Sequence, residues 1–145
     1  MVSFSVRYGS DENMSRILIV DDEADVLRML SALFRSHGHH VVVTDDGNEA
    51  VDLLRGKETF DLMISDVRMI PINGIWLLSL VREECPTMPV IMVTAYYSKE
   101  MAVEALRMGA LDYIAKPFDT QKLVDLVNKT LKSQAKSAAK AAPAP

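Results

Sequence analysis

The chain is poor in cysteine, in long apolar runs and in glycine-rich loops. Its one cysteine, Cys85, cannot form a disulfide within the chain, which favours a reducing, cytoplasmic setting. No apolar run approaches the roughly 18 residues that a membrane-spanning helix needs, and the polar segment 1–15 lacks the continuous apolar region of a signal peptide. Gly47 and Gly74 belong to no G-x-G-x-x-G or Walker motif, so we expect no glycine loop that cradles a phosphate.

The excess of negative over positive charge is also small. The formal net charge is -4, which argues against broad binding of nucleic acid or of an anionic membrane surface through the folded part. The 145 residues, of which 49% are hydrophobic, suit one domain with one core. We therefore predict a single domain that binds neither nucleic acid nor membrane directly.

Both ends of the chain differ from the middle. Segment 1–15 has no useful periodicity and reads as a flexible leader, and Met14 offers a second start, so whether residues 1–13 are native stays open. Segment 133–145 is a low-complexity Ala/Lys/Pro tail. The tail suits either a natural end or the junction to a larger regulator. The domain itself is expected at 16–132.

Five short apolar runs alternate with helical patterns inside 16–132. The runs are 17–20, 41–43, 62–65, 90–93 and 113–115, and the helices are expected after Asp22, at 49–55, 74–84 and 98–108, and after Asp119. Helical crossovers between short strands force parallel pairing, and runs that are apolar on both faces fit a sheet covered on both sides. We predict an α/β, doubly wound, flavodoxin-like (βα)5 fold with strand order 2-1-3-4-5.

Polar residues follow four of the five strands. They are Asp21, Asp22, Asp66, Thr94 and Lys116, and parallel strands bring all of them to one edge of the sheet. Open α/β sheets bind ligands at this edge. In the predicted order the second strand lies at the margin, so its terminus stays away from the pocket.

Three carboxylates at one edge indicate a cation site. At an effective dielectric constant of about 20, each close pair of charges costs about 4 kcal/mol, which a bound cation relieves. Hard oxygen ligands with open positions suit Mg²⁺. We expect Asp22, Asp66 and the backbone carbonyl of Arg68 to be direct ligands, and Asp21 to hold a metal-bound water. The alternative is that the acids only cap the first helix.

Asp66 is the candidate nucleophile, because a carboxylate can attack a phosphoryl group and form an acyl phosphate. Lys116 supplies a compact positive charge, and a cis bond to Pro117 would turn it into the pocket. Thr94 offers a hydroxyl, and Tyr113 an aromatic ring with a polar tip. Taken singly, each also suits an ordinary strand or strand end.

Other reactive side chains lack convergent partners. His37, His39 and His40 lack the spacing of a zinc site, and we expect a solvated helix terminus there. Cys85 has no base beside it in the sequence and is expected to be inert.

Four motifs stand at the strand ends: Ile17-Leu18-Ile19-Val20-Asp21-Asp22-Glu23, Asp66-Val67-Arg68-Met69, Val93-Thr94-Ala95 and Asp112-Tyr113-Ile114-Ala115-Lys116-Pro117-Phe118. With them, 16–132 resembles the receiver domain of two-component response regulators. The resemblance implies that Asp66 takes a phosphoryl group from a sensor histidine kinase or phosphotransfer protein. It also implies Mg²⁺ at Asp21, Asp22 and Asp66, Thr94 and Tyr113 as a switch pair, and Lys116 as the cation that senses phosphate.

The sequence departs from this family at two places beside the pocket. Ile70-Pro71 stands where members often have Pro-Gly, which puts the local backbone and the phosphate lifetime in question. Tyr96-Tyr97 is bulkier than the small residues often found after the threonine, so these rings would narrow the pocket mouth or contact a partner.

Three functions compete. The first is a phosphorylation switch that reshapes the face of the fourth helix, fifth strand and fifth helix to control an unknown partner or output domain; whether it drives dimerisation through Met101, Leu106 and Met108 stays open. The second is a haloacid-dehalogenase-like phosphatase, which typically has an acid where Arg68 stands. The third is an interaction module that takes no phosphate, against which the complete acidic set argues.

Overall fold

The computed structural model describes residues 15–141. Five strands alternate with five helices in these residues: β1 Arg16–Val20, α1 Ala24–Ser36, β2 His40–Thr44, α2 Gly47–Leu54, β3 Leu62–Asp66, α3 Gly74–Glu84, β4 Val90–Thr94, α4 Lys99–Arg107, β5 Asp112–Ala115 and α5 Thr120–Ala141. All strand pairs are parallel, in the order β2-β1-β3-β4-β5. The predicted fold class and strand order are therefore confirmed.

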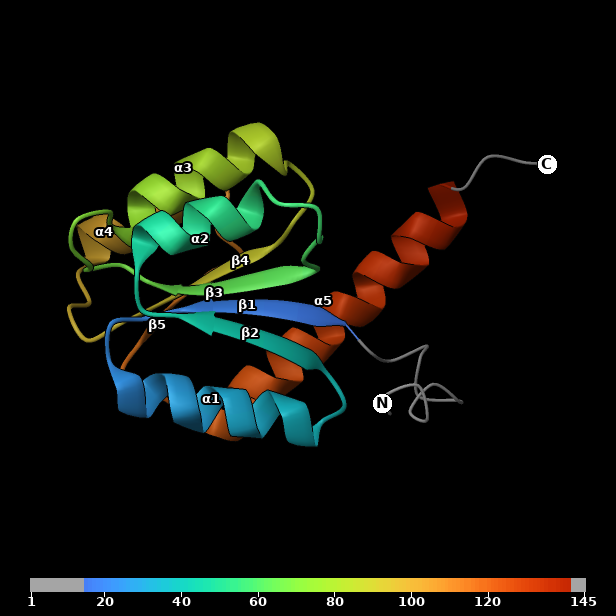
Figure 1. The fold of residues 1–145 in the computed structure, drawn as a ribbon, viewed down its shortest axis with the longest axis horizontal. Helices are drawn as coiled ribbons and strands as arrows, with labels where there is room; N and C mark the ends of the chain where they lie inside the picture. The colour runs from blue at the N-terminus through green and yellow to red at the C-terminus, as the bar shows by residue number, and fades with distance from the viewer. Residues whose placement is uncertain (1–14, 142–145) are drawn as a thin grey trace.

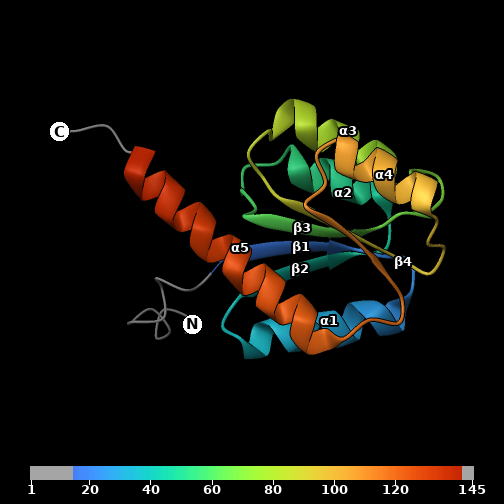
Figure 2. The same ribbon diagram turned by 180° about the vertical axis from the view of Figure 1, so that it is seen from behind.

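The sheet forms the middle of three layers. Helices α2, α3 and α4 cover one face, and α1 and α5 cover the other (Figures 1 and 2). Alternate residues of β1 go to opposite cores: Leu18 and Val20 join the cluster under α2–α4, and Ile17 and Ile19 join the cluster under α1 and α5. This two-sided burial is why apolar residues follow one another in each strand and do not alternate with polar ones.

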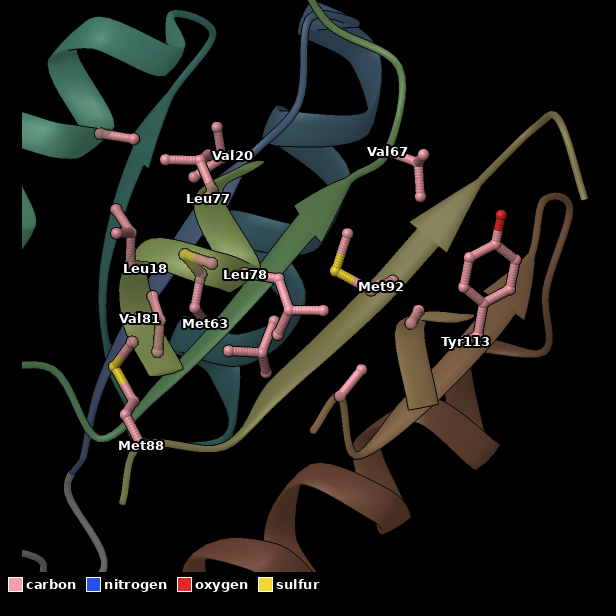
Figure 3. Close-up of a cluster of buried hydrophobic side chains, with 14 of the residues drawn as sticks. Leu18, Val20, Met63, Val67, Leu77, Leu78, Val81, Met88, Met92 and Tyr113 are labelled. Carbon is pink, nitrogen blue, oxygen red and sulfur yellow. The ribbon is translucent and has the colours of Figure 1, made fainter. Parts of the chain in front are cut away.

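The core under α2–α4 contains Met63 of β3 and Val90 and Met92 of β4. Figure 3 shows Met63 and Met92 on these strands, with Leu77, Leu78 and Val81 of α3 packed over them. Each of these side chains is almost fully buried. The packing holds β3 and β4, whose ends carry Asp66 and Thr94, in fixed register.

Capping residues determine where helices α2 and α4 begin. The side chain of Ser98 accepts a hydrogen bond from Met101 N at 3.1 Å, and Gly109 has a φ of 103°, as expected for the start and end of α4. Helix α2 begins at Gly47 rather than at 49, because Asp46 accepts a hydrogen bond from Asn48 N at 2.7 Å. Our prediction missed Asp46 as an N-cap.

The two ends of the chain remain only partly described. Helix α5 continues to Ala141, into the segment predicted to be a low-complexity tail, and leads away from the sheet in Figures 1 and 2. The predicted leader falls almost entirely on residues 1–14, which lie outside the described residues. Among residues 15–141, no helix is both long enough and apolar enough to span a membrane.

Candidate functional site

Two neighbouring strands bring the three carboxylates together. Val20 of β1 pairs with Ser65 of β3, so Asp21 and Asp66 leave the sheet side by side. Carboxylate oxygens of Asp21, Asp22 and Asp66 all lie within 4.8 Å of one another. Asp21 and Asp66 are buried, whereas Asp22 is exposed. The arrangement is thus a pocket with one carboxylate at its mouth and two in its wall.

Lys116 reaches this pocket from the end of β5. Its Nζ lies 2.8 Å from Asp21 Oδ2, 2.7 Å from Glu23 Oε1 and 3.3 Å from Asp66 Oδ2. The peptide bond from Lys116 to Pro117 is cis. The lysine therefore neutralises part of the negative charge that the carboxylates concentrate.

Glu23 is the pocket residue that our sequence analysis did not assign. It occupies the N-cap position of α1, but its side chain makes no capping hydrogen bond and extends to Lys116 instead. Asp21 Oδ1 accepts a hydrogen bond from Glu23 N at 2.9 Å. The run Asp21-Asp22-Glu23 therefore both begins α1 and builds the pocket, and its third acid was the available signal.

The charges in the pocket shift each other's pKa. Burial raises the pKa of the Asp21 carboxyl, and the nearby charge of Asp66 adds to this, while hydrogen bonds from Lys116 and Glu23 N oppose it. Burial disfavours the Lys116 ammonium, yet its hydrogen bonds to Asp21 and Glu23 outweigh burial and raise its pKa. Lys116 is therefore a permanent cation at neutral pH.

Thr94 and Tyr113 lie on the adjacent strands β4 and β5, Thr94 at the carboxyl end of its strand and Tyr113 two residues before the end of its own. Thr94 is fully buried, and its Oγ1 accepts a hydrogen bond from Tyr96 N at 2.9 Å. Tyr113 is 6% exposed, so its ring already lies inward in this structure. Burial, then the neighbouring Tyr97 and Asp66, raise the pKa of the Tyr113 phenol.

A cavity of ≈ 690 Å³ opens over Asp22 and Asp66, and Tyr96 and Arg68 line its mouth. The Arg68 guanidinium carbon lies 4.4 Å from the centre of the Tyr96 ring, in cation–π geometry. The backbone N–H of Arg68 donates to Asp66 Oδ1 at 3.3 Å. The Arg68–Tyr96 pair therefore connects the loop after β3 with the loop after β4 at the cavity, beside the Asp66 carboxylate.

The loop after β3 brings the start of α3 close to the end of β3, although Ile70-Pro71 replaces the residues common in the family. Ile70-Pro71 is cis, and the Ile70 side chain is 91% exposed. Beyond it, Gly74 N donates to Val67 O at 2.8 Å. A Cβ at Gly74 would lie 2.0 Å from the backbone oxygen of Asp66, so only glycine permits this approach.

The histidines require one correction. His37 and His40 are exposed, but His39 is buried, and its Nε2 lies 2.9 Å from Asn128 Oδ1 of α5. The expected solvated terminus is therefore wrong for His39, because α5 packs across the start of β2. Sequence periodicity carried no signal of that contact.

A doubly wound sheet with carboxylates and a lysine gathered where β1 meets β3 defines a class of signalling domain, the receiver. The family model for the response regulator receiver domain matches residues 17–128. The chain therefore belongs to the response regulator receiver family of two-component signal transduction. This is a signalling domain and not a conventional enzyme, which decides against the phosphatase alternative.

Curated relatives are much longer than this chain. Transcriptional regulatory protein ZraR of Escherichia coli (strain K12) is 42% identical over 115 residues, which make up 79% of this chain and 26% of that protein. Response regulator protein FleR of Pseudomonas aeruginosa is 41% identical over 113 residues, 78% of this chain and 24% of that protein. The chain spans about a quarter of the length of these relatives.

Solved receiver domains have the same fold over their whole length. A CheY-like receiver domain protein from Methanospirillum hungatei JF-1 has a TM-score of 0.81 and 31% identity, with 86% of this chain and 98% of that chain covered. The Francisella response regulator 1452 receiver domain has a TM-score of 0.76 and 31% identity, with 83% and 98% covered.

Proposed function

We propose that Asp66 accepts a phosphoryl group, in a Mg²⁺-dependent reaction, from the phosphohistidine of a sensor histidine kinase or phosphotransfer protein. One observation carries the proposal. The buried Asp66 carboxylate lies 3.3 Å from Lys116 Nζ and shares a 4.8 Å cluster with Asp21 and Asp22. A nucleophile, a fixed cation and a ligand set for a divalent metal thus meet at one point.

The chain's own groups account for the transfer. A carboxylate oxygen of Asp66 forms a bond to phosphorus as the bond from phosphorus to the donor's imidazole nitrogen breaks. The imidazole leaves with the bonding electron pair, and Asp66 carries an acyl phosphate. Lys116 exchanges contact with carboxylates for contact with a phosphoryl oxygen, so its charge follows the new anion.

The residues present fit Mg²⁺. Three carboxylates supply hard oxygen donors, and their clustering within 4.8 Å concentrates negative charge that a divalent ion would relieve. Asp21, Asp22, Asp66 and the carbonyl oxygen of Arg68 would hold the ion. When bound, Mg²⁺ supplies neutralisation of charge on the transferring group.

The switch would act through Thr94 and Tyr113. Attraction of the Thr94 hydroxyl to a phosphoryl oxygen on Asp66 replaces its present hydrogen bond from Tyr96 N. A change of position at Thr94 reaches Tyr113 because β4 and β5 are paired, with Met92 opposite Tyr113 and Thr94 opposite Ala115. The surface of α4, β5 and α5 then presents a different contact to a partner.

The names of the curated relatives suggest the kind of output that this domain controls. Its relatives ZraR and FleR are a transcriptional regulatory protein and a response regulator, so we propose control of a transcription-regulating partner or attached domain, with no DNA contact by 16–132. Leu106 and Met101 on α4 are exposed, whereas Ala105 between them is buried. An interface between two copies would use the exposed pair and leave Ala105 to the core.

Intact mass after incubation with acetyl phosphate tests the proposal. We expect a gain of one phosphoryl group in Mg²⁺ and none when EDTA replaces Mg²⁺, with peptide mapping placing the group at Asp66. No gain with Mg²⁺, or an equal gain in EDTA, would contradict the proposed reaction. No gain with Mg²⁺ would instead favour the alternative of an interaction module that takes no phosphate.

Replacing Tyr96 with alanine is expected to shorten the lifetime of the phosphorylated protein. The variant loses the ring that stacks on Arg68 at the pocket mouth, and water gains access to the acyl phosphate. Exposed cation–π pairs contribute about 0.5–1 kcal/mol, so we expect loss of phosphate about two- to fivefold faster. The decay of the phosphorylated mass after removal of acetyl phosphate measures this.

Tyr96→Phe is the matched control, since it retains the stacked ring and is expected to decay like the unaltered protein. An unchanged or longer lifetime in Tyr96→Ala would show that the Arg68–Tyr96 pair does not limit access of water.

A further inference from the structure

The loop from β4 to α4 carries two adjacent tyrosines that contact different parts of the molecule. The Tyr96 ring lies under Arg68 at the pocket mouth. The Tyr97 ring meets Tyr113 edge-on, with ring centres 5.3 Å apart and planes at 68°. Tyr97 is 53% exposed, whereas Tyr113 is 6% exposed. Tyr97 therefore covers the outer side of a buried ring.

The inward position of Tyr113 carries a cost. Its hydroxyl is buried and makes no hydrogen bond with any protein group in residues 15–141, and a buried phenol without a partner is unfavourable. The body of the ring belongs to the core cluster with Met92, Ala102 and Ala105, and Figure 3 shows it beside β4. The contacts of the ring must therefore offset the loss of hydration at its tip.

The position of β5 in the sheet allows a second, outward position of the Tyr113 ring. It is the last strand in the order β2-β1-β3-β4-β5, with a neighbouring strand on one side only among the described residues. A side chain on such a strand can turn away from the core toward solvent, where the hydroxyl would be hydrated. The contacts that hold the Tyr113 ring inward therefore determine its position in the unphosphorylated protein.

We propose that Tyr97 is a positioning residue that holds the Tyr113 ring in its buried position before Asp66 carries any phosphoryl group. The edge-on geometry is the favoured one for aromatic pairs, and such a pair shifts a two-state equilibrium by roughly two- to twelvefold. The inference rests on the proposed function only in treating Tyr113 as a switch residue. Its consequence is a resting protein already biased toward the inward state.

The same loop links this contact to Thr94. Tyr96 N, one residue before Tyr97, donates to Thr94 Oγ1 at 2.9 Å. Movement of that hydroxyl toward a phosphoryl group would release this backbone bond and free Tyr97 to shift. Tyr97 thus depends on the position of Thr94 and acts on Tyr113.

Fluorine NMR of the unphosphorylated, full chain labelled with 3-fluorotyrosine tests the proposal. The Tyr113 signal is assigned by its loss in Tyr113→Phe, and its shift between H₂O and D₂O reports solvent exposure. In Tyr97→Ala we expect the ratio of buried to exposed Tyr113 to fall at least about twofold. A ratio that changes by less than this would overturn the proposal.

Two controls sharpen the test. Tyr97→Phe keeps the ring and is expected to keep Tyr113 buried, whereas Val103→Ala removes exposed apolar surface from α4 and is expected to leave the signal unchanged. A loss of burial in Val103→Ala equal to that in Tyr97→Ala would overturn a specific role of Tyr97. If Tyr97→Ala does not fold, as judged by circular dichroism, Tyr97→Leu is measured against the same criterion.

No phosphoryl donor enters this measurement. A protein that takes no phosphate on Asp66 would overturn the proposed function and leave the Tyr97 result standing. Normal phosphorylation together with an unchanged Tyr113 signal in Tyr97→Ala would overturn the role of Tyr97 and leave the proposed function standing.

Discussion

Replacing Asp66 with asparagine is expected to abolish phosphorylation of this protein by acetyl phosphate in Mg²⁺. Asparagine has the shape of aspartate, but its amide is not a nucleophile toward phosphorus. The side chain is buried at the end of β3, against Lys116 and beside Asp21, so a variant of equal size preserves the packing. Intact mass should show no gain in the variant, under conditions that convert the unaltered protein.

Asp45→Asn is the matched control. Asp45 is an exposed carboxylate just after β2, the strand that lies at the margin of the sheet. It shares the strand-end position of Asp66 but lies on another strand, outside the carboxylate cluster. We expect its phosphorylation to be normal. Phosphate on an aspartate of the Asp66→Asn variant, at a rate near that of the unaltered protein, would mean that the site assignment is wrong.

Replacing Gly74 with alanine is expected to destabilise the fold and damage the site together. The added Cβ would lie 2.0 Å from the backbone oxygen of Asp66 and 2.8 Å from Met92 Cε. Backbone oxygen in a paired strand cannot yield as a flexible side chain does, so β3 or α3 must move. We expect a loss of about 3 kcal/mol in the free energy of unfolding, and a melting temperature lower by roughly 10 °C.

Urea unfolding measures this loss, and the rate of phosphorylation by acetyl phosphate measures the displacement of Asp66. Gly56→Ala serves as the comparison, because its Cβ would meet only the carbonyl oxygens of Asp52 and Leu53, at 3.3 and 3.4 Å. There we expect a change of no more than about 1 kcal/mol. A Gly74→Ala protein as stable as the Gly56→Ala protein would disprove the close approach of α3 to β3.

The fold could be predicted because local patterns and chain connectivity agree. Strand β4 is apolar at its first four positions, and helix α4 has a cap at Ser98 and a glycine after its end. Parallel pairing and the right-handed crossover then leave few arrangements. The start of α2 was predicted two residues too late, because Asp46 is a cap whose side chain acts ahead of the apolar pattern.

The carboxylate cluster could also be predicted, since it follows from strand ends alone. Asp66 ends β3, and Asp21 and Lys116 directly follow β1 and β5, and a parallel sheet carries all such positions to one edge. The end of a strand determines where the backbone lies and does not determine the direction of a long side chain. Glu23 was missed for this reason, as its path to Lys116 is a matter of side-chain direction.

By itself, the sequence determined the layers, the strand order and the edge at which the chemistry gathers, because these depend on periodicity and connectivity. Only the tertiary structure decided which groups touch. It placed Tyr96 on Arg68 and Tyr97 on Tyr113, buried His39 against Asn128, and brought Gly74 against the backbone of Asp66. Each is a contact between residues of different elements or loops, and its energy depends on ångström distances that no pattern along one strand or helix records.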